Sequence, residues 1–444
     1  MNTSIRIIIC VLLISTLTIA QEKNTIKYST NKEQKIKPLV NGNPFIIYSE
    51  ILKEDREIHM YVPSDYDESN KKYPVLYVLD GESEFHQITG IVEELSGGGR
   101  IQEMIVVGIP NVSSRDHRIR DFGRAPNKLL EKFAPLGLKA DNFISFLEKE
   151  LIVYINQNYR TNNFRILTGK SLSGNFTMDI MLRKPSLFEA YIASSPVIGS
   201  NDDLVFRKAK AEFVKEKKFN KFLYFSMANE SLGNYELIQR PIPNFIKLLE
   251  ENAPSDFNWS YKHFPEENHS TIGLITNYYG LVKLYESWRP PSFSSIQDFK
   301  DRGGINYVKE NYKKSKIFGS KVTDSLPQRH IMSLASLYRK ERKFSELREF
   351  ILNEPGVNTE VLRKIGEWFL HWPAGYEKEA IFYFKIWAKR HPKSYAPLLA
   401  ISHSHFILKQ KRKSDEYQKK ATSVYNESPD SDFEAWQARY SIRD

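Results

Sequence analysis

The feature that most constrains the fold is a series of short apolar segments that alternate with helically periodic segments between residues 45 and 288. Continuous runs of β-branched and aromatic residues are typical of strands buried on both faces, and intervening helices connect parallel strands. We therefore predict an α/β fold with a doubly wound, mostly parallel sheet. The predicted strands lie in residues 73–81, 103–111, 164–171, 190–197 and 221–230.

Residues 45–66 have a different pattern, in which apolar and polar residues alternate. Alternation with a period of two is typical of a strand with one buried face. We predict an antiparallel hairpin at the edge of the sheet.

The alternation of strand-like and helix-like segments ends after residue 288. The chain has 444 residues, more than one hydrophobic core usually supports, so two domains are expected. The proline- and serine-rich stretch 286–299 predicts a linker, and no convincing strand follows it. We predict an α/β domain at 40–288, a linker at 289–295 and a helical domain at 296–444.

The helical third contains a repeat marked by prolines. Pro355, Pro392 and Pro429 each follow an amphipathic segment and precede another, and successive prolines are 37 positions apart. Helix pairs recurring near this period are typical of α-solenoids and resemble tetratricopeptide repeats. An ordinary helical bundle with coincident prolines is the alternative.

The N-terminus is typical of a cleaved signal peptide, predicted at residues 1–20. Arg6 precedes an apolar run at 7–19 that is short for a membrane span, although an uncleaved anchor is the alternative. The single cysteine, Cys10, lies in this run, so the mature chain has no disulfide. We expect an exported protein in a bacterial periplasm or outside the cell.

The net charge of +10 belongs mostly to the C-terminal third, where residues 295–444 hold 28 Lys/Arg and 19 Asp/Glu. The charge run at 409–420 has one aromatic residue, Tyr417, and not the stripe of interleaved aromatics of a nucleic-acid surface, so no nucleic-acid partner is expected. We expect the helical domain to bind an anionic protein partner or to self-associate.

A candidate nucleophile, Ser171, lies in the stretch "LTGKSLSGNFT", between a predicted strand and a predicted helix. This is the context of a nucleophile elbow, whose tight turn needs small residues two positions before and after the serine. Gly169 meets the first requirement, and Ser173 stands where glycine is usual. A simple Gly/Ser turn is the alternative.

A nucleophilic serine needs a base and an acid, and their order along the chain selects candidates. The histidine of an α/β-hydrolase follows the last strand, which favours His269; His263 is expected to be a strand-face residue. Glu230 is the first carboxylate after the preceding strand, and Glu236 is its rival.

The oxyanion hole needs two backbone N–H groups. Leu172, after the nucleophile, supplies one, and Gly81 or Glu82 in the loop after an early strand supplies the other. No metal-ligand spacing is present, and the chemistry needs no cofactor.

A loop of four arginines covers residues 113–124. Loops at the carboxyl edge of such a sheet bind ligands, so Arg115 and Arg118 are candidates to contact an anionic substrate. Local pairing with Asp116 and Asp121 is the alternative.

The motifs "DREIHMYVPSDY", "YPVLYVLDGE", "IVVGIPN", "GKSLSG" and "ENHST" occur in this order. The stretch 40–288 thereby resembles the putative-esterase family of α/β-hydrolases, which includes esterase D, enterochelin esterases and carbohydrate esterases. The resemblance implies that Ser171 is the nucleophile, His269 the base and Glu230 the acid. The family usually has glycine where Ser173 and Ser270 stand.

We therefore expect an exported serine esterase that acts on a siderophore ester or an acylated carbohydrate through an acyl-enzyme. Two alternatives stay open. One is an acyltransferase on the same triad, and the other is a non-catalytic scaffold that acts through the helical repeats.

Overall fold

The computed structural model describes residues 43–440, apart from 65, 68–69, 112–114, 216–217, 231–234, 315–324, 372–374, 428 and 430–431. The predicted signal peptide at 1–20 lies outside the described residues. Residues 41–444 group into one compact unit, and the division at 289–295 stays a prediction.

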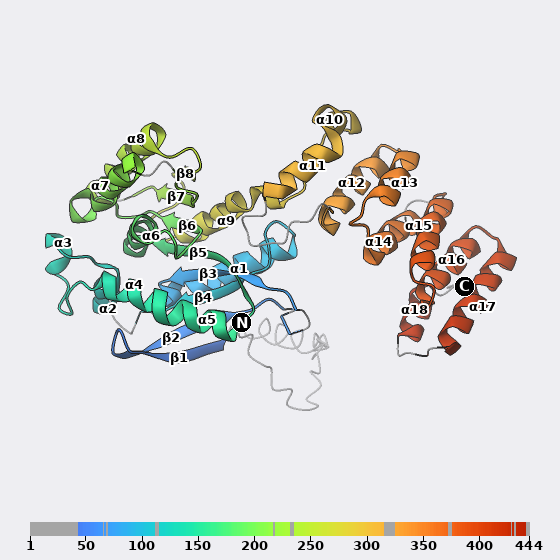
Figure 1. The fold of residues 1–444 in the computed structure, drawn as a ribbon, viewed down its shortest axis with the longest axis horizontal. Coiled ribbons are helices and arrows are strands. Elements are labelled where there is room, and N and C mark those ends of the chain that lie inside the picture. The colour runs from blue at the N-terminus through green and yellow to red at the C-terminus, as the bar shows by residue number, and fades with distance from the viewer. Residues whose placement is uncertain are drawn as a thin grey trace, which may run out of the picture. The chain divides into compact units, whose positions relative to one another are not determined.

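Eight strands form one sheet in the order β1-β2-β4-β3-β5-β6-β7-β8 (Figure 1). β1 and β2 form the predicted antiparallel hairpin, β2 pairs antiparallel with β4, and all other neighbours are parallel. The strand bounds are β1 Asn43–Ser49, β2 Glu54–Tyr61, β3 Tyr73–Leu79, β4 Ile105–Ile109, β5 Thr161–Lys170, β6 Ala190–Ser194, β7 Phe222–Ala228 and β8 Asn258–Phe264.

Helices accompany the sheet in the pattern expected of parallel crossovers. Their bounds are α1 Gly81–Gly97, α2 Arg115–Phe122, α3 Lys128–Glu131, α4 Ala140–Phe146, η1 Leu147–Leu151, α5 Ile152–Asn158, α6 Leu172–Arg183, α7 Ser200–Lys215, η3 Tyr235–Gln239, α8 Pro241–Asn252, α9 Ile272–Leu284 and η4 Glu286–Trp288.

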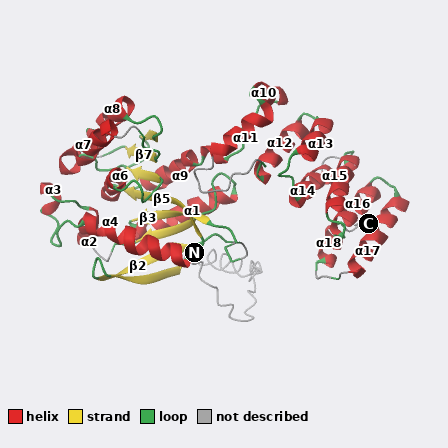
Figure 2. Cartoon of the chain, viewed as in Figure 1, coloured by secondary structure: helices red, strands yellow, loops and turns green. Residues whose placement is uncertain are grey.

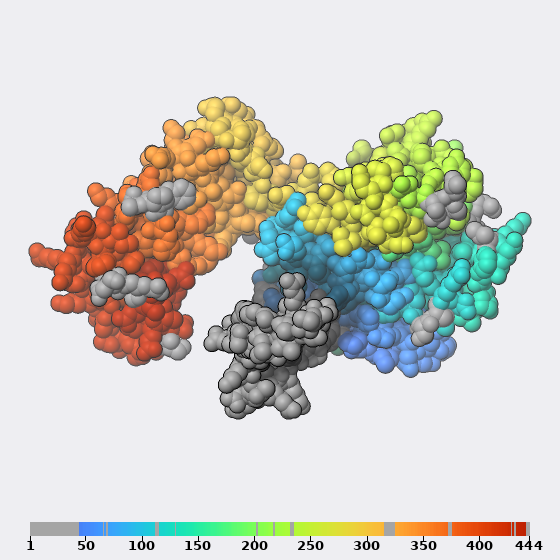
Figure 3. Space-filling model, turned by 180° about the vertical axis from the view of Figure 1, so that it is seen from behind, coloured from blue at the N-terminus to red at the C-terminus, as the bar shows by residue number. Residues whose placement is uncertain are grey.

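The central strands are buried on both faces, which explains their continuous apolar sequences. Every residue of β3 is buried, and alternate residues enter different apolar clusters. Tyr77 packs in the cluster that contains residues of α4, α6 and α8, whereas Leu76 and Val78 pack in the cluster that contains residues of α1 and α9. Helices therefore cover both faces of the sheet (Figure 2), and α1 and α9 lie side by side on the face seen in Figure 3.

After η4 the described residues contain helices and no further strand. The helices are α10 Ile296–Asp301, α11 Gly304–Lys313, α12 Gln328–Lys340, α13 Phe344–Asn353, α14 Thr359–His371, α15 Glu377–Arg390, α16 Ala396–Ile407, α17 Lys411–Glu427 and α18 Phe433–Arg439. Their buried apolar residues form a cluster of their own, from Ile296 to Tyr440. Within the described part of the chain, every helix is too short or too polar to span a lipid bilayer.

The three repeat prolines occupy equivalent places among these helices. Pro355, Pro392 and Pro429 are each the second residue after the end of a helix, α13, α15 and α17 respectively, and precede the next helix. Proline has no backbone N–H and clashes with the preceding turn, so it favours the end of a helix at each place. α14 packs on α15, α15 on α16 and α16 on α17. The tetratricopeptide character stays a prediction.

A buried carboxylate joins the last helix to the rest of the helical region. Glu367 on α14 accepts hydrogen bonds from Arg439 at 2.9 Å, from Tyr440 at 2.7 Å and from Arg363 at 2.6 Å. Burial opposes the charged form, but the hydrogen bonds from Arg439 and Tyr440 and the two arginine charges outweigh it and lower the pKa of Glu367. The ionised form is therefore stabilised by folding.

We expect Glu367→Ala to lower the free energy of unfolding by about 1–3 kcal/mol, because the substitution leaves Tyr440 and Arg439 without their acceptor. Since folding lowers the pKa of Glu367, its contribution is present near neutral pH and is lost as the pH falls through the acidic range. Urea denaturation of both proteins at neutral and acidic pH measures the effect. An equal stability difference at both pH values would contradict this assignment.

Candidate active site

Ser171 lies at a sharp turn between β5 and α6, the strand–turn–helix context that the sequence predicted. Its backbone has φ 61° and ψ −114°, a region that residues other than glycine rarely adopt. Such a conformation costs about 1–3 kcal/mol and is typical of functional turns. Gly169 is needed here, because a side chain on it would come within 2.6 Å of the backbone of Ser173.

Ser173, at the position where the resemblance to esterases implies glycine, is fully buried. The hydroxyl lies 2.6 Å from Asp80 Oδ2 and 2.9 Å from both the amide nitrogen and the carbonyl oxygen of Lys170. The departure from the family pattern therefore adds a polar connection between the elbow and the loop after β3.

Asp80 is the centre of a buried hydrogen-bond network at the carboxyl end of β3. Its carboxylate accepts two hydrogen bonds from the guanidinium of Arg118, at 2.7 and 2.9 Å, and one from the side-chain amide of Asn111 at 2.7 Å. Its backbone is left-handed, with φ 54°, a conformation that aspartate tolerates better than most residues. With Ser173, the network joins the loops after β3, β4 and β5.

The sequence suggested that Arg118 contacts an anionic substrate. In the structure its hydrogen bonds are instead to other residues of the protein. The polar edge of its guanidinium is directed to Asp80 and to the carbonyl of Lys170, which favours a positioning role. The nearby aspartate Asp121 pairs instead with Arg120. Arg115 is exposed and stacks its cation over Phe133, and its role in substrate binding stays a prediction.

A second buried network holds α2, the helix that carries Arg118. Arg56 on β2 is fully buried and donates to Asp121 at 2.8 Å and to the carbonyl of Pro110 at 3.0 Å. Arg120 pairs with both Asp121 and Glu54. Because these charges are buried in pairs, the arrangement fixes α2 against the hairpin.

His269 lies in the loop between β8 and α9, and its Nδ1 is 2.8 Å from Oε2 of Glu230. The side chain of Glu230 is fully buried, whereas the imidazole is about one third exposed. A carboxylate at Nδ1 holds the proton on that nitrogen and leaves Nε2 as the free base. The rival acid, Glu236, is exposed and pairs with Arg240 at 2.7 Å.

Backbone contacts join the loops that carry these residues. The amide of Asn229 donates to the carbonyl of Glu267 at 2.8 Å, which connects the Glu230 and His269 loops. Lys170, next to Ser171, extends its ammonium to buried Glu84 at 2.5 Å and to the carbonyl of Ser270 at 3.4 Å. The structure thus joins the neighbours of Ser171 and His269 through one lysine.

The predicted oxyanion donors are at the first residues of two helices. Leu172 begins α6, and Gly81 and Glu82 begin α1. The first N–H groups of a helix have no intrahelical acceptor and carry its positive dipole end, so they suit a developing anion. Gly81 packs so closely on β4 that a Cβ would lie 2.6 Å from the amide nitrogen of Ile109.

Sequence reasoning missed Asp80, Asn111 and the Lys170–Glu84 pair. The position of Asp80, at the end of a buried strand directly before glycine, is the one signal that could have drawn attention to it. Among the described residues no cluster of His, Cys, Asp or Glu could hold a metal ion. The side chains and backbone N–H groups described above can supply acid–base and electrostatic chemistry.

Parts of the chain are similar to known esterases. Residues 49–230 match the family described as Putative esterase. The chain is 31% identical over 181 residues to the ferri-bacillibactin esterase BesA of Bacillus subtilis, covering 37% of this chain and 61% of that protein. It is 30% identical over 155 residues to the siderophore triacetylfusarinine C esterase of Aspergillus fumigatus, covering 33% and 51%.

The crystal structure of an IroE-like serine hydrolase from Shewanella oneidensis has a similar fold. The TM-score is 0.54 at 27% identity, and the match covers 69% of this chain and 96% of the other. This likeness confirms the predicted α/β fold class. The chain spans between half and two thirds of the length of the two siderophore esterases.

We expect Ser173→Ala to lower kcat about tenfold with little change in KM, because Asp80 loses its contact with the elbow and the oxyanion donors lose their alignment. Ester hydrolysis by the purified variant measures this.

Thr177→Val is the matched control for Ser173→Ala. Thr177 is a buried α6 residue whose hydroxyl donates to the Ser173 carbonyl and not to Asp80. The control should lose comparable stability and keep its kcat. An unchanged kcat in Ser173→Ala would remove the positioning role.

Proposed function

We propose that the chain is a serine carboxylic ester hydrolase with Ser171, His269 and Glu230 as its triad, since residues 49–230 match the family described as Putative esterase. The observation that carries the proposal is the 2.8 Å contact between His269 Nδ1 and the buried carboxylate of Glu230. It gives the imidazole a fixed tautomer in a loop joined to the elbow.

In the proposed first step, the Ser171 hydroxyl attacks the ester carbonyl while Nε2 of His269 takes its proton. The carbonyl oxygen becomes an anion and accepts hydrogen bonds from the N–H of Leu172 and from that of Gly81 or Glu82. When the intermediate collapses, the alcohol leaves with the proton from His269 and the acyl group remains on Ser171.

In the proposed second step, water attacks the acyl-enzyme and gives its proton to His269. The acid is released and the Ser171 hydroxyl is restored. Glu230 stays ionised throughout, holds the imidazole in place and stabilises the imidazolium. Its burial strengthens this interaction, since fewer water molecules compete for the carboxylate.

The substrate class we propose is the siderophore ester. One relative is named a siderophore triacetylfusarinine C esterase and another a ferri-bacillibactin esterase. Arg115 is exposed in the helix that follows β4, and we propose that it contacts an anionic substrate. We further propose export, supported by the apolar N-terminal sequence.

We expect Ser171→Ala to lower ester turnover at least about a thousandfold, since only binding and oxyanion stabilisation remain. Ferric enterobactin, methyl ferulate, acetylated xylan and p-nitrophenyl acetate provide the substrate panel, and circular dichroism checks the fold. A fluorophosphonate probe should label Ser171. Labelling of a different serine would refute the nucleophile, and preference for the carbohydrate esters would refute the siderophore class.

We expect Glu230→Gln to lower kcat by at least about a hundredfold, because glutamine neither holds the imidazole tautomer reliably nor stabilises the imidazolium. Glu236→Gln is the matched control, removing the same charge from an exposed site on the same stretch of chain, and should stay within about twofold of the wild type. The reverse ranking would transfer the acid role to Glu236.

A further inference from the structure

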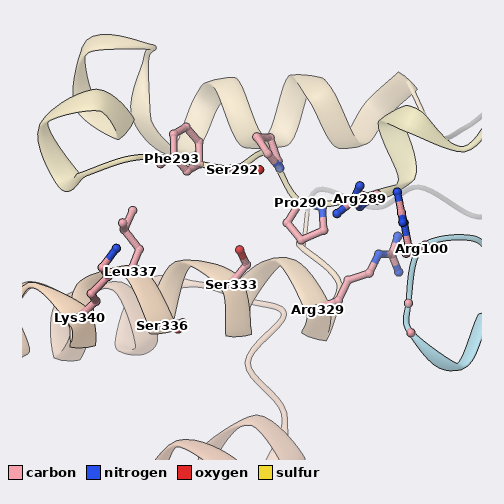
Figure 4. A pocket seen from close by; sticks show the side chains of 13 residues that line it. Arg100, Arg289, Pro290, Ser292, Phe293, Arg329, Ser333, Ser336, Leu337 and Lys340 are labelled. Atoms are coloured by element: carbon pink, nitrogen blue, oxygen red, sulfur yellow. The ribbon is translucent and has the colours of Figure 1, made fainter. Parts of the chain in front are cut away.

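A cavity of about 540 Å³ lies between the segment 289–293 and α12, with the loop 98–100 at one end (Figure 4). Its lining includes four cationic side chains, from Arg100, Arg289, Arg329 and Lys340. Among the described residues, no aspartate or glutamate lines it. None of the residues proposed for ester hydrolysis lies on its wall.

The cations gather where like charges repel one another. Figure 4 shows the guanidinium groups of Arg100, Arg289 and Arg329 at the same end of the cavity. Arg100 and Arg329 are half-buried and Arg289 is exposed. Like charges gathered at one end of a cavity repel one another, and a bound anion would compensate this repulsion. Their arrangement therefore favours the binding of negative charge.

Arg329 is held rigidly but is not neutralised. Its Nε donates to the carbonyl of Trp288 at 2.9 Å, and its guanidinium lies 3.6 Å from the centroid of the Trp288 ring. Its Nη2 is buried and has no hydrogen-bond partner among the described residues. Burial lowers its pKa to about 10, so it stays charged near neutral pH with donor capacity unused.

The other cations are likewise without a carboxylate partner in the described structure. Arg100 donates to the phenol oxygen of Tyr278 at 2.8 Å, which is a neutral acceptor. The hydroxyl groups of Ser333 and Ser336 line the same wall of α12. Guanidinium forks and hydroxyls together match an anion that has several oxygen atoms.

We propose that this cavity binds a tetrahedral oxyanion, a phosphate or sulfate group, either free or carried on a small organic molecule. The volume exceeds that of the bare ion, and Phe293 and Pro290 offer an apolar wall to a carrier. The site is separate from the proposed ester chemistry. A bound anion would join three segments of the chain and stabilise the folded protein.

Isothermal titration of the full-length protein with inorganic phosphate, sulfate and glycerol 3-phosphate tests the site, with ionic strength held constant by sodium chloride. We expect saturable binding of at least one of these anions, and a matching rise in Tm. Binding of inorganic phosphate or sulfate would show that the free ion is a sufficient ligand for the site. Binding of glycerol 3-phosphate alone would show that the site needs a phosphate group attached to an organic molecule.

Arg289→Ala should weaken this binding at least tenfold while leaving hydrolysis of small esters unchanged. The matched control is Lys283→Ala, which removes one positive charge nearby, from a lysine already paired with Glu286 at 2.6 Å. The control should bind like the wild type. Absence of saturable binding, or equal affinity in Arg289→Ala and wild type, would overturn the proposal.

Discussion

The carboxylate of Asp80 is the interaction on which the candidate site depends. It accepts hydrogen bonds from Asn111 and Arg118, which lie in the segment after β4, and from Ser173 in the first turn of α6. A buried carboxylate with several hydrogen-bond donors restricts the relative positions of the segments that carry those donors. Removing any one partner would leave polar groups buried without compensation.

The sheet supplies the rigid base for this network. Its central strands are buried on both faces, and the two apolar clusters divide alternate residues of each strand between them. The strained backbone of Ser171 is held because β5 and α6 on either side of it are well packed. Catalytic geometry here is thus proposed to derive from ordinary core packing.

Much of this could be predicted from the sequence, because the signals are local. The continuous apolar run at 73–81 predicted a buried strand, and β3 covers Tyr73–Leu79. Chain order alone placed Glu230 and His269 after the last two strands, and the structure brings them into contact. These inferences needed only periodicity and the order of the elements along the chain.

The partners of the arginines could not be predicted in the same way. Arg118 has Asp116 and Asp121 close by in sequence, yet its partner is Asp80, 38 positions away. The cations of the cavity at 289–293 are also far apart in sequence. Such contacts depend on how loops fold back over the sheet, and no local pattern encodes them.

The separate apolar cluster of the helical region has a consequence for how the sequence can change over time. The cluster contains no residue from the strands or from the helices that cover them. The effect on stability of a substitution in the surface of α12–α18 therefore depends on the packing of those helices and not on that of the sheet. The two regions are free to diverge at different rates, so a new binding specificity can arise in one while the other keeps its chemistry.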